Sequence, residues 1–294
     1  MTNIFINGLI KKLDDARFNP SLFSLNYAVC AFEGIRSYVT EDRSTLVFRL
    51  KDHCFRMIKS MDYLGMESDF KDVDKMIEAI STLIIANGSG NQYIRPIAFF
   101  DEGIMSVKNR PNLNFAVMSF PFQKDMPMSA HKLFISGICS DISTQNYKIS
   151  RNYFGSFMAL NTIVGEKDNF EVIQYDENKN ICETSAHNIF LKFENSGWIT
   201  PPDDSCLSGI TRHTAIELLR ENGIGVEKRS IQISELVGVT SCFLTSTAGE
   251  IINVSHIDGR RLNSECNDVL EIISNYRSLV TGKTNTRSEW ITYV

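Results

Sequence analysis

One stretch near the middle of the chain, residues 121–129 (PFQKDMPMS), contains two prolines and shows neither helical nor strand periodicity. Proline lacks a backbone N–H and keeps the preceding residue out of the helical region, so such a stretch interrupts regular structure. Strand and helix patterns are dense on both sides of it. The sequence therefore predicts two domains, residues 1–122 and 131–294, joined by a linker over residues 123–130.

Both halves mix strands with helices. Runs of β-branched and aromatic residues between turn residues predict strands, and apolar residues at helical spacing predict helices. In the first half, we expect strands over residues 31–38, 45–50, 92–100 and 113–120, and helices over 51–61 and 72–87. In the second half, we expect strands over residues 132–139, 171–175, 189–193 and 241–245, and helices over 154–167, 211–219 and 264–279. This mixture predicts an α+β fold.

Charge and composition exclude several classes of function. The net charge is −5 and the chain has no Lys/Arg run, which argues against a nucleic-acid partner. The longest apolar stretches are too short to cross a membrane. Seven cysteines show no paired spacing and five histidines show no metal-binding pattern. We therefore expect a soluble, cytoplasmic protein of enzyme size, with reduced thiols and no metal site.

Residues 146–155 (NYKISRNYFG) place Lys148 among β-branched, aromatic and small polar residues. Loss of hydration disfavours the ammonium form of a lysine held in such surroundings, and a reactive amine is what a Schiff-base lysine needs. An isolated lysine is more often solvated. A catalytic lysine and a surface lysine are therefore both open from this segment alone.

Two turns rich in small residues have the composition of anion-binding sites. Residues 206–212 (CLSGITR) lead into a predicted helix, whose first N–H groups and positive dipole end suit a phosphate, and Thr211 can add a hydroxyl. Residues 244–250 (LTSTAGE) end a predicted strand, where backbone N–H groups and hydroxyls can bind a phosphate or a carboxylate. An ordinary helix start and an ordinary turn are the alternatives.

Charged residues within strand-like runs need partners of opposite charge. Glu183 lies between two such runs, where a protonated pyridine nitrogen or a structural cation would serve, and Asn188 can fix the turn between them. Arg36 and Arg95 lie in predicted strands, so a carboxylate or phosphate partner is expected for each. Arg56, on a predicted helix, either faces solvent or reaches a phosphate.

In this order, the motifs resemble those of the class IV (fold-type IV) pyridoxal-phosphate aminotransferases, and most of all the branched-chain amino acid aminotransferases. Residues 32–38 (FEGIRSY) are similar to that family's FEGIRAY block, and residues 48–56 (FRLKDHCFR) to its FRLxEHxxR block. Residues 93–96 match its YIRP strand, residues 207–212 resemble LPGITR, and residues 245–250 resemble SGTAAE. The resemblance covers nearly the whole chain. It implies a small N-terminal α/β domain and a larger C-terminal cofactor domain with a mixed, barrel-like sheet, as in D-amino acid aminotransferase.

The resemblance also implies roles for individual residues toward pyridoxal 5′-phosphate. Lys148 would be the Schiff-base lysine and later the proton shuttle, and Glu183 would keep the cofactor's ring nitrogen protonated. Tyr153 would contact the phenolic oxygen side of the ring. The other residues that would hold the cofactor, most of them around its phosphate, are Arg56, Asn188, Leu207, Gly209, Ile210, Thr211, Ser246 and Thr247.

The implied reaction moves an amino group from an L-amino acid, branched-chain or otherwise hydrophobic, to a 2-oxo acid such as 2-oxoglutarate. At least a homodimer is implied, with Tyr27 contributed across the interface. The second carboxylate of 2-oxoglutarate would need a cation, for which Arg95 and Arg36 are candidates. The residues that would bind substrate are Tyr27, Phe32, Gly34, Arg36, Tyr93, Arg95, Thr247 and Ala248.

The chain departs from the family pattern near the lysine and near Asn188. Ser150 and Arg151 stand where two glycines are common, and His187 stands where an acid is usual. Other readings therefore stay open: D-amino acid transamination, aminodeoxychorismate lyase chemistry, or a specialised or non-catalytic homologue with the same fold. Retention of the lysine, the glutamate and the helix arginine favours a working aminotransferase.

Overall fold

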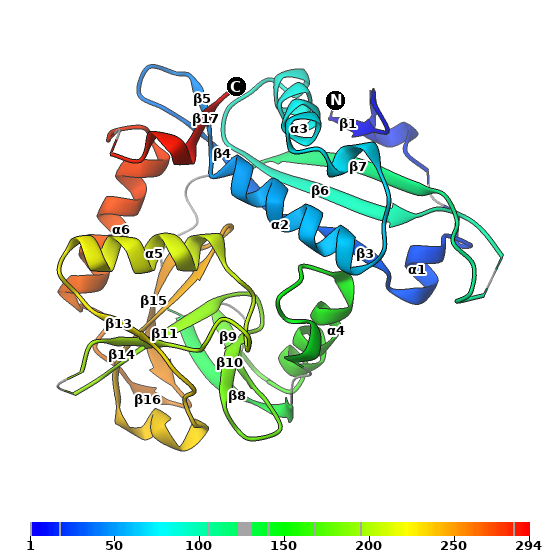
Figure 1. Cartoon of the computed structure of the whole chain (residues 1–294). Helices are drawn as coiled ribbons and strands as arrows, with labels where there is room; N and C mark the ends of the chain where they lie inside the picture. Colours follow the sequence, from blue (N-terminus) through cyan, green and yellow to red (C-terminus); the bar gives the residue numbers. More distant parts are fainter. Residues whose placement is uncertain are drawn as a thin grey trace. The chain divides into compact units, whose positions relative to one another are not determined.

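The computed structural model describes residues 2–17, 19–104, 106–122, 131–139, 142–166, 169–194, 196–284 and 286–294 (Figure 1). Its contacts divide the chain into two units. The first unit contains the described residues of Met1–Asp125, Tyr147–Arg151 and Ser278–Val294, and the second contains those of Met126–Asn146 and Asn152–Arg277. The predicted linker, residues 123–130, lies outside the described residues, and the predicted domain boundaries stay a prediction.

An antiparallel sheet forms the framework of the first unit. Its strands lie in the order β17 (Ile291–Tyr293), β5 (Thr45–Phe48), β4 (Ile35–Val39), β6 (Gln92–Phe100), β7 (Leu113–Pro121), β1 (Asn3–Ile6) and β2 (Leu9–Lys12). A short strand, β3 (Cys30–Phe32), also pairs with β6. The predicted strand over residues 31–38 is therefore two strands, because residues 33 and 34 leave the ladder between them.

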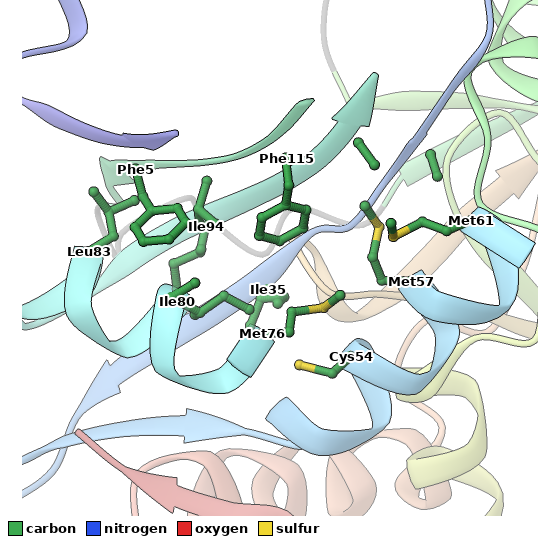
Figure 2. Packing of buried hydrophobic residues seen from close by; sticks show 14 of the residues in the cluster. Phe5, Ile35, Cys54, Met57, Met61, Met76, Ile80, Leu83, Ile94 and Phe115 are labelled. Atoms are coloured by element: carbon green, nitrogen blue, oxygen red, sulfur yellow. The ribbon is translucent and has the colours of Figure 1, made fainter. Parts of the chain in front are cut away.

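Helices α2 (Leu50–Tyr63) and α3 (Val73–Ala86) pack on this sheet and bury the core of the first unit. Asp72 caps α3 by accepting a hydrogen bond from the Lys75 N–H at 3.0 Å, so α3 begins where the sequence predicts. Figure 2 shows the side chains that fill the space between helices and sheet, among them Phe5, Ile35, Cys54, Met57, Met61, Met76, Ile80, Leu83, Ile94 and Phe115.

A mixed sheet forms the framework of the second unit. Its strands lie in the order β10 (Ile181–Thr184), β9 (Phe170–Tyr175), β8 (His131–Cys139), β15 (Glu250–Ile257), β14 (Val239–Ser246), β11 (Asn188–Phe193), β12 (Trp198–Thr200) and β13 (Val226–Lys228), with β16 (Arg260–Arg261) on β15. Strand β8 runs parallel to β9 and β15, and β12 runs parallel to β13. The remaining named pairs of this sheet are antiparallel, so the sheet is mixed as expected.

The remaining helices are α1 (Phe23–Tyr27), α4 (Ser150–Leu160), α5 (Ile210–Glu221) and α6 (Asn267–Val280). Helix α4 differs from the predicted helix over residues 154–167, because its start is fixed by tertiary contacts that a local pattern does not reveal. The Ser150 hydroxyl donates to the Ala28 carbonyl at 2.5 Å and accepts from the Cys30 N–H at 3.2 Å. Tyr153 consequently lies within α4, half-buried, and not in a loop before it.

Among the described helices, none combines the length and apolar composition that crossing a membrane requires. Within the same residues, no three His, Cys, Asp or Glu side chains are grouped as a metal site would need.

The C-terminal segment belongs to the first unit, although the predicted C-terminal domain included it. Strand β17 pairs with β5, and the Arg49 N–H donates to the Trp290 carbonyl at 2.6 Å. The Arg49 guanidinium lies 4.6 Å from the centroid of the Trp290 ring, which also packs edge-on against Phe48. The chain end is therefore held at the start of α2 through one buried aromatic side chain.

We expect Trp290→Ala to lower the free energy of unfolding by about 3–5 kcal/mol, the usual cost of removing a buried large aromatic side chain. Tyr293→Ala is the matched control, because Tyr293 lies in the same segment with its side chain exposed. Urea unfolding of both variants measures the difference. Equal stabilities for the two variants would contradict an anchoring role for Trp290.

Candidate active site

Aromatic and cationic side chains gather on one face of β4 and β6. Arg36 lies opposite Tyr93 in the antiparallel register, and Phe32 of β3 lies opposite Ile97. Since residues directly opposite share a face, and alternate residues along a strand share it too, these side chains leave the sheet on the same side as Arg95. The other face of β6 packs into the core, so this face is the one available to a ligand.

Close packing on this face depends on a glycine. The Arg95 Nη2 group donates to the Tyr93 hydroxyl at 2.9 Å, and the Arg95 guanidinium lies 4.7 Å from the centroid of the Phe32 ring. A Cβ at Gly34 would overlap the Tyr93 hydroxyl. Gly34 therefore lets Tyr93 and its arginine partner approach the backbone, and the resulting cationic, aromatic surface suits a carboxylate with an apolar side chain.

The structure places Lys148 beside this face, in an extended segment next to β3. The Phe32 N–H donates to the Lys148 carbonyl at 3.1 Å, and Ile149 forms a bridge with Ala31. The Lys148 N–H donates to the Ser60 hydroxyl at 2.9 Å. Its Nζ atom lies 5.2 Å from the centroid of the Phe32 ring, and its side chain is half-buried. The lysine, the aromatic residues and Arg95 are thus brought together within one unit.

Arg56 is held by a buried carboxylate for which the motif analysis gave no role. Its Nε and Nη2 groups donate to the two Glu33 oxygens at 2.6 and 2.9 Å. The His53 Nδ1 atom lies 2.8 Å from Glu33 Oε2, which also accepts from the Gly34 N–H at 3.1 Å. Glu33 is fully buried. A sequence signal existed, because His53 and Arg56 are three residues apart on one helix face and Glu33 is an acid among apolar residues.

Burial and charge together set the ionisation of this cluster. Burial alone would raise the pKa of Glu33, but the Arg56 and His53 side chains hold that pKa well below its ordinary value. Burial lowers the pKa of His53; Glu33 opposes this, and the charges of Arg56 and Lys148 lower it further. At neutral pH, Glu33 is therefore ionised, and His53 is a neutral imidazole that donates its Nδ1–H.

In the second unit, Glu183 is oriented by neutral donors. Its Oε2 atom accepts from the Asn188 side-chain amide at 3.2 Å and from the Leu207 N–H at 3.3 Å. The same Asn188 amide donates to the Leu207 carbonyl at 3.0 Å. The three residues, predicted separately, thus form one arrangement that fixes a half-buried carboxylate.

Helix α5 begins next to this carboxylate. No side chain caps its first turn, which contains no acidic residue, and both Ile210 and Thr211 are buried. A Cβ at Gly209 would overlap the Asn188 Oδ1 atom, so glycine is required at the N-cap. The first N–H groups of a helix have no partner within the helix. This uncapped start has the features of an anion site.

The turn between β14 and β15 carries the remaining predicted residues, Ser246, Thr247 and Ala248. The Ser246 hydroxyl accepts from the Gly249 N–H at 2.9 Å, which closes the turn. A Cβ at Gly249 would lie 2.8 Å from the His187 Nε2 atom, so a side chain there would displace the histidine. The backbone and hydroxyls of such a turn can bind a phosphate or a carboxylate.

His187, which stands where the family usually has an acid, is paired with an acid from a neighbouring strand. Its Nδ1 atom lies 3.2 Å from the Glu171 Oε1 atom, close enough for an ion pair, although it is not aligned as a hydrogen bond. Burial would raise the pKa of Glu171, but contacts with His187 and with the Ser185 and Thr184 hydroxyls lower it. An ionised carboxylate is therefore still present beside this turn.

Comparison with known proteins identifies relatives over the full length. The profile of the family described as amino-transferase class IV matches residues 30–257. The branched-chain-amino-acid aminotransferase of Pseudomonas aeruginosa is 28% identical, over 99% of this chain and 97% of that protein. A probable branched-chain-amino-acid aminotransferase of Rickettsia felis is 30% identical over 87% of each chain.

Solved structures agree with these relatives. The branched-chain aminotransferase of Thermoproteus uzoniensis, solved with norvaline, has a TM-score of 0.91 and 28% identity over 99% of each chain. The branched-chain amino acid aminotransferase of Escherichia coli has a TM-score of 0.89 and 26% identity, over 99% of this chain and 98% of that one. The predicted family and the predicted two-domain α+β fold are confirmed.

We expect Glu33→Gln to lower the free energy of unfolding near neutral pH by about 3–5 kcal/mol, because it leaves the buried Arg56 cation without a counter-charge. The pKa of Glu33 is lower in the folded chain than in the unfolded chain. Its stabilisation is therefore present above the unfolded value of about 4.3 and is lost as the pH falls below it. Urea unfolding from pH 3 to 7 measures this change.

The control for this prediction is Glu67→Gln, because Glu67 pairs with Lys71 at the exposed surface. We expect its unfolding curve to follow the wild type across the pH range. A gap between the wild type and Glu33→Gln that stays constant down to pH 3 would contradict an ionised Glu33.

We expect Gly209→Ala to displace Asn188 and to destabilise the second unit by about 1–3 kcal/mol, the usual cost of overpacking. Gly225→Ala is the control, since a Cβ there meets nothing within 4 Å. Thermal unfolding compares the two variants. Equal midpoints would mean that the Asn188 side chain adjusts without strain.

Proposed function

Because the chain belongs to the class IV aminotransferases, we propose that it transfers the amino group of a branched-chain or other hydrophobic L-amino acid to a 2-oxo acid such as 2-oxoglutarate, with bound pyridoxal 5′-phosphate. The observation that carries the proposal is Lys148. Its peptide is held on both sides, and its half-buried side chain reaches the aromatic face that also carries Arg95.

The groups on each unit fit this cofactor. Lys148 supplies the primary amine for a Schiff base, and Glu183 supplies an oriented carboxylate for the protonated ring nitrogen. The uncapped start of α5, at Ile210 and Thr211, supplies N–H groups suited to a phosphate. Arg56 and Thr247 are the other residues proposed to hold the phosphate, and Tyr153 is proposed to lie beside the phenolic oxygen.

The protein's own part in the reaction is to hold and move protons. When bound, the cofactor supplies an electron sink for the charge that develops at the substrate α-carbon. The Lys148 Nζ atom accepts the α-proton and later returns a proton to carbon on the other side of the exchange. Glu183 stays ionised and keeps the ring nitrogen protonated, because its oxygens are oriented by N–H donors.

Substrate choice is assigned to the face of β4 and β6. Phe32 and Tyr93 offer apolar surface to the substrate side chain, and Arg95 or Arg36 offers a cation to the second carboxylate of 2-oxoglutarate. Structures of relatives support both ligand types. Branched-chain amino acid aminotransferases similar to this chain were solved with 4-methylvaleric acid and with N-(5′-phosphopyridoxyl)-L-glutamate.

A homodimer in the cytoplasm completes the proposal, with Tyr27 contributed across the dimer interface. Helix α1 exposes Leu25, and helix α4 exposes Phe154 and Phe157, each with more than half of its surface accessible in the single chain. Large apolar side chains exposed on helices are typical of protein contacts when they form a patch. The irregular spacing of the cysteines is typical of a reducing compartment.

The visible absorption spectrum of the purified protein tests the function. We expect a cofactor band that L-leucine bleaches and D-alanine does not. Lys148→Ala should lose that band and about 10⁴-fold of its turnover, whereas Lys51→Ala, at an exposed lysine of α2, should retain both. Bleaching by D-alanine alone would favour the D-amino acid alternative. A colourless wild type that cannot be reconstituted with the cofactor would favour a non-catalytic homologue.

A further inference from the structure

We propose that Ser60 is a positioning residue for the Schiff-base lysine, holding the Lys148 peptide on helix α2. The inference rests on the proposed function of Lys148. Ser60 lies one helical turn after Arg56 and is fully buried, although a serine is usually exposed. Nothing in the sequence motifs assigns it a role.

The hydrogen bonds of Ser60 leave its hydroxyl one orientation. A hydroxyl has a single proton to donate, and Ser60 donates it to the Arg56 carbonyl at 3.0 Å within the helix. The oxygen then faces the Lys148 N–H as an acceptor at 2.9 Å. A helix carbonyl thus fixes the hydroxyl, and the hydroxyl fixes the peptide of the lysine.

The residue before the lysine is held by the same end of α2. The Tyr147 ring stacks on the Tyr63 ring with centroids 4.0 Å apart and planes 17° apart. The Lys59 Nζ atom lies 5.4 Å from the centroid of the Tyr147 ring. Contacts from Lys59, Ser60 and Tyr63 therefore bind residues 147 and 148 to one stretch of helix.

The opposite side of the lysine peptide is held by β3, through the Phe32 N–H and the bridge between Ala31 and Ile149. With its N–H bound to α2 and its carbonyl bound to β3, the Lys148 backbone is fixed while its side chain can still move. A proton shuttle needs this combination, because Nζ must serve different atoms from one fixed origin.

Helix α2 also connects the lysine to the residue proposed for the phosphate. Arg56 supplies its carbonyl to Ser60 and its guanidinium to the buried Glu33. One turn of helix therefore sets both the origin of the lysine and the place of the arginine. Without the Ser60 hydroxyl, the Lys148 N–H loses its described partner and the lysine is free to shift from this frame.

The test compares Ser60→Ala with Ser37→Ala. Ser37 is also fully buried in the first unit, donates to the Gly90 carbonyl at 2.5 Å and accepts from the Gln92 N–H at 3.1 Å. It therefore loses the same two kinds of hydrogen bond on substitution, but it contacts neither the lysine segment nor Arg56 in the described contacts. Urea unfolding of both variants corrects for any difference in stability.

The decisive measurement is the rate at which added pyridoxal 5′-phosphate becomes attached to Lys148, trapped with borohydride and located by peptide mass spectrometry. The pH midpoint of the visible absorption is the second reading. We expect Ser60→Ala to slow attachment about tenfold and to shift that midpoint, because a displaced lysine is poorly aligned. Ser37→Ala should stay within about twofold of the wild type. Equal rates and equal midpoints in the two variants would overturn the inference.

Two further results separate the possible failures. If Ser60→Ala does not fold, Ser60→Cys replaces it, since a thiol of similar size is a weaker donor and acceptor and should give an intermediate rate; a wild-type rate in Ser60→Cys would overturn the inference. If wild-type protein forms no adduct at Lys148, the proposed function itself fails. An adduct in the wild type with equal rates in both alanine variants defeats only the role of Ser60.

Discussion

The first unit depends on a carboxylate that could not be buried without its partners. Glu33 is fully buried between β3 and β4 and accepts hydrogen bonds from Arg56, His53 and the Gly34 N–H. An unpaired ion there would cost more than the fold could supply, so sheet and helix must meet in one register. That register places the end of α2 beside the lysine segment, and thereby makes the remaining contacts of Lys148 possible.

Helix α2 performs two tasks through two adjacent stripes of its surface. Cys54, Met57 and Met61 face the core of the first unit (Figure 2). His53, Arg56 and Ser60, shifted by one position, share the neighbouring stripe and bind Glu33 and the lysine peptide. A buried polar stripe beside an apolar one explains why the helix carries charged and hydroxyl groups at positions that are not exposed to solvent.

Local patterns predicted most elements well, whereas long-range partners were beyond them. Strand β6 has the predicted bounds of residues 92–100, because alternation and turn residues are local signals. The pairing of Arg56 with Glu33 and of β17 with β5 joins segments far apart in the chain, and no periodicity reports such contacts. The motif resemblance identified Lys148 and Glu183, yet it was silent on Ser60, since its role is visible only once helix and lysine segment lie together.

The loss of the family's two glycines after the lysine has a physical explanation at Ser150. Its hydroxyl binds the Ala28 carbonyl and the Cys30 N–H, which attaches the start of α4 to the chain that leads into β3. The lysine segment is thus tied on its C-terminal side by a side chain, where glycines would leave the backbone more freedom. Arg151, the second departure, has an exposed side chain. The substitutions therefore tighten the frame around Lys148 and leave the groups proposed for its chemistry in place.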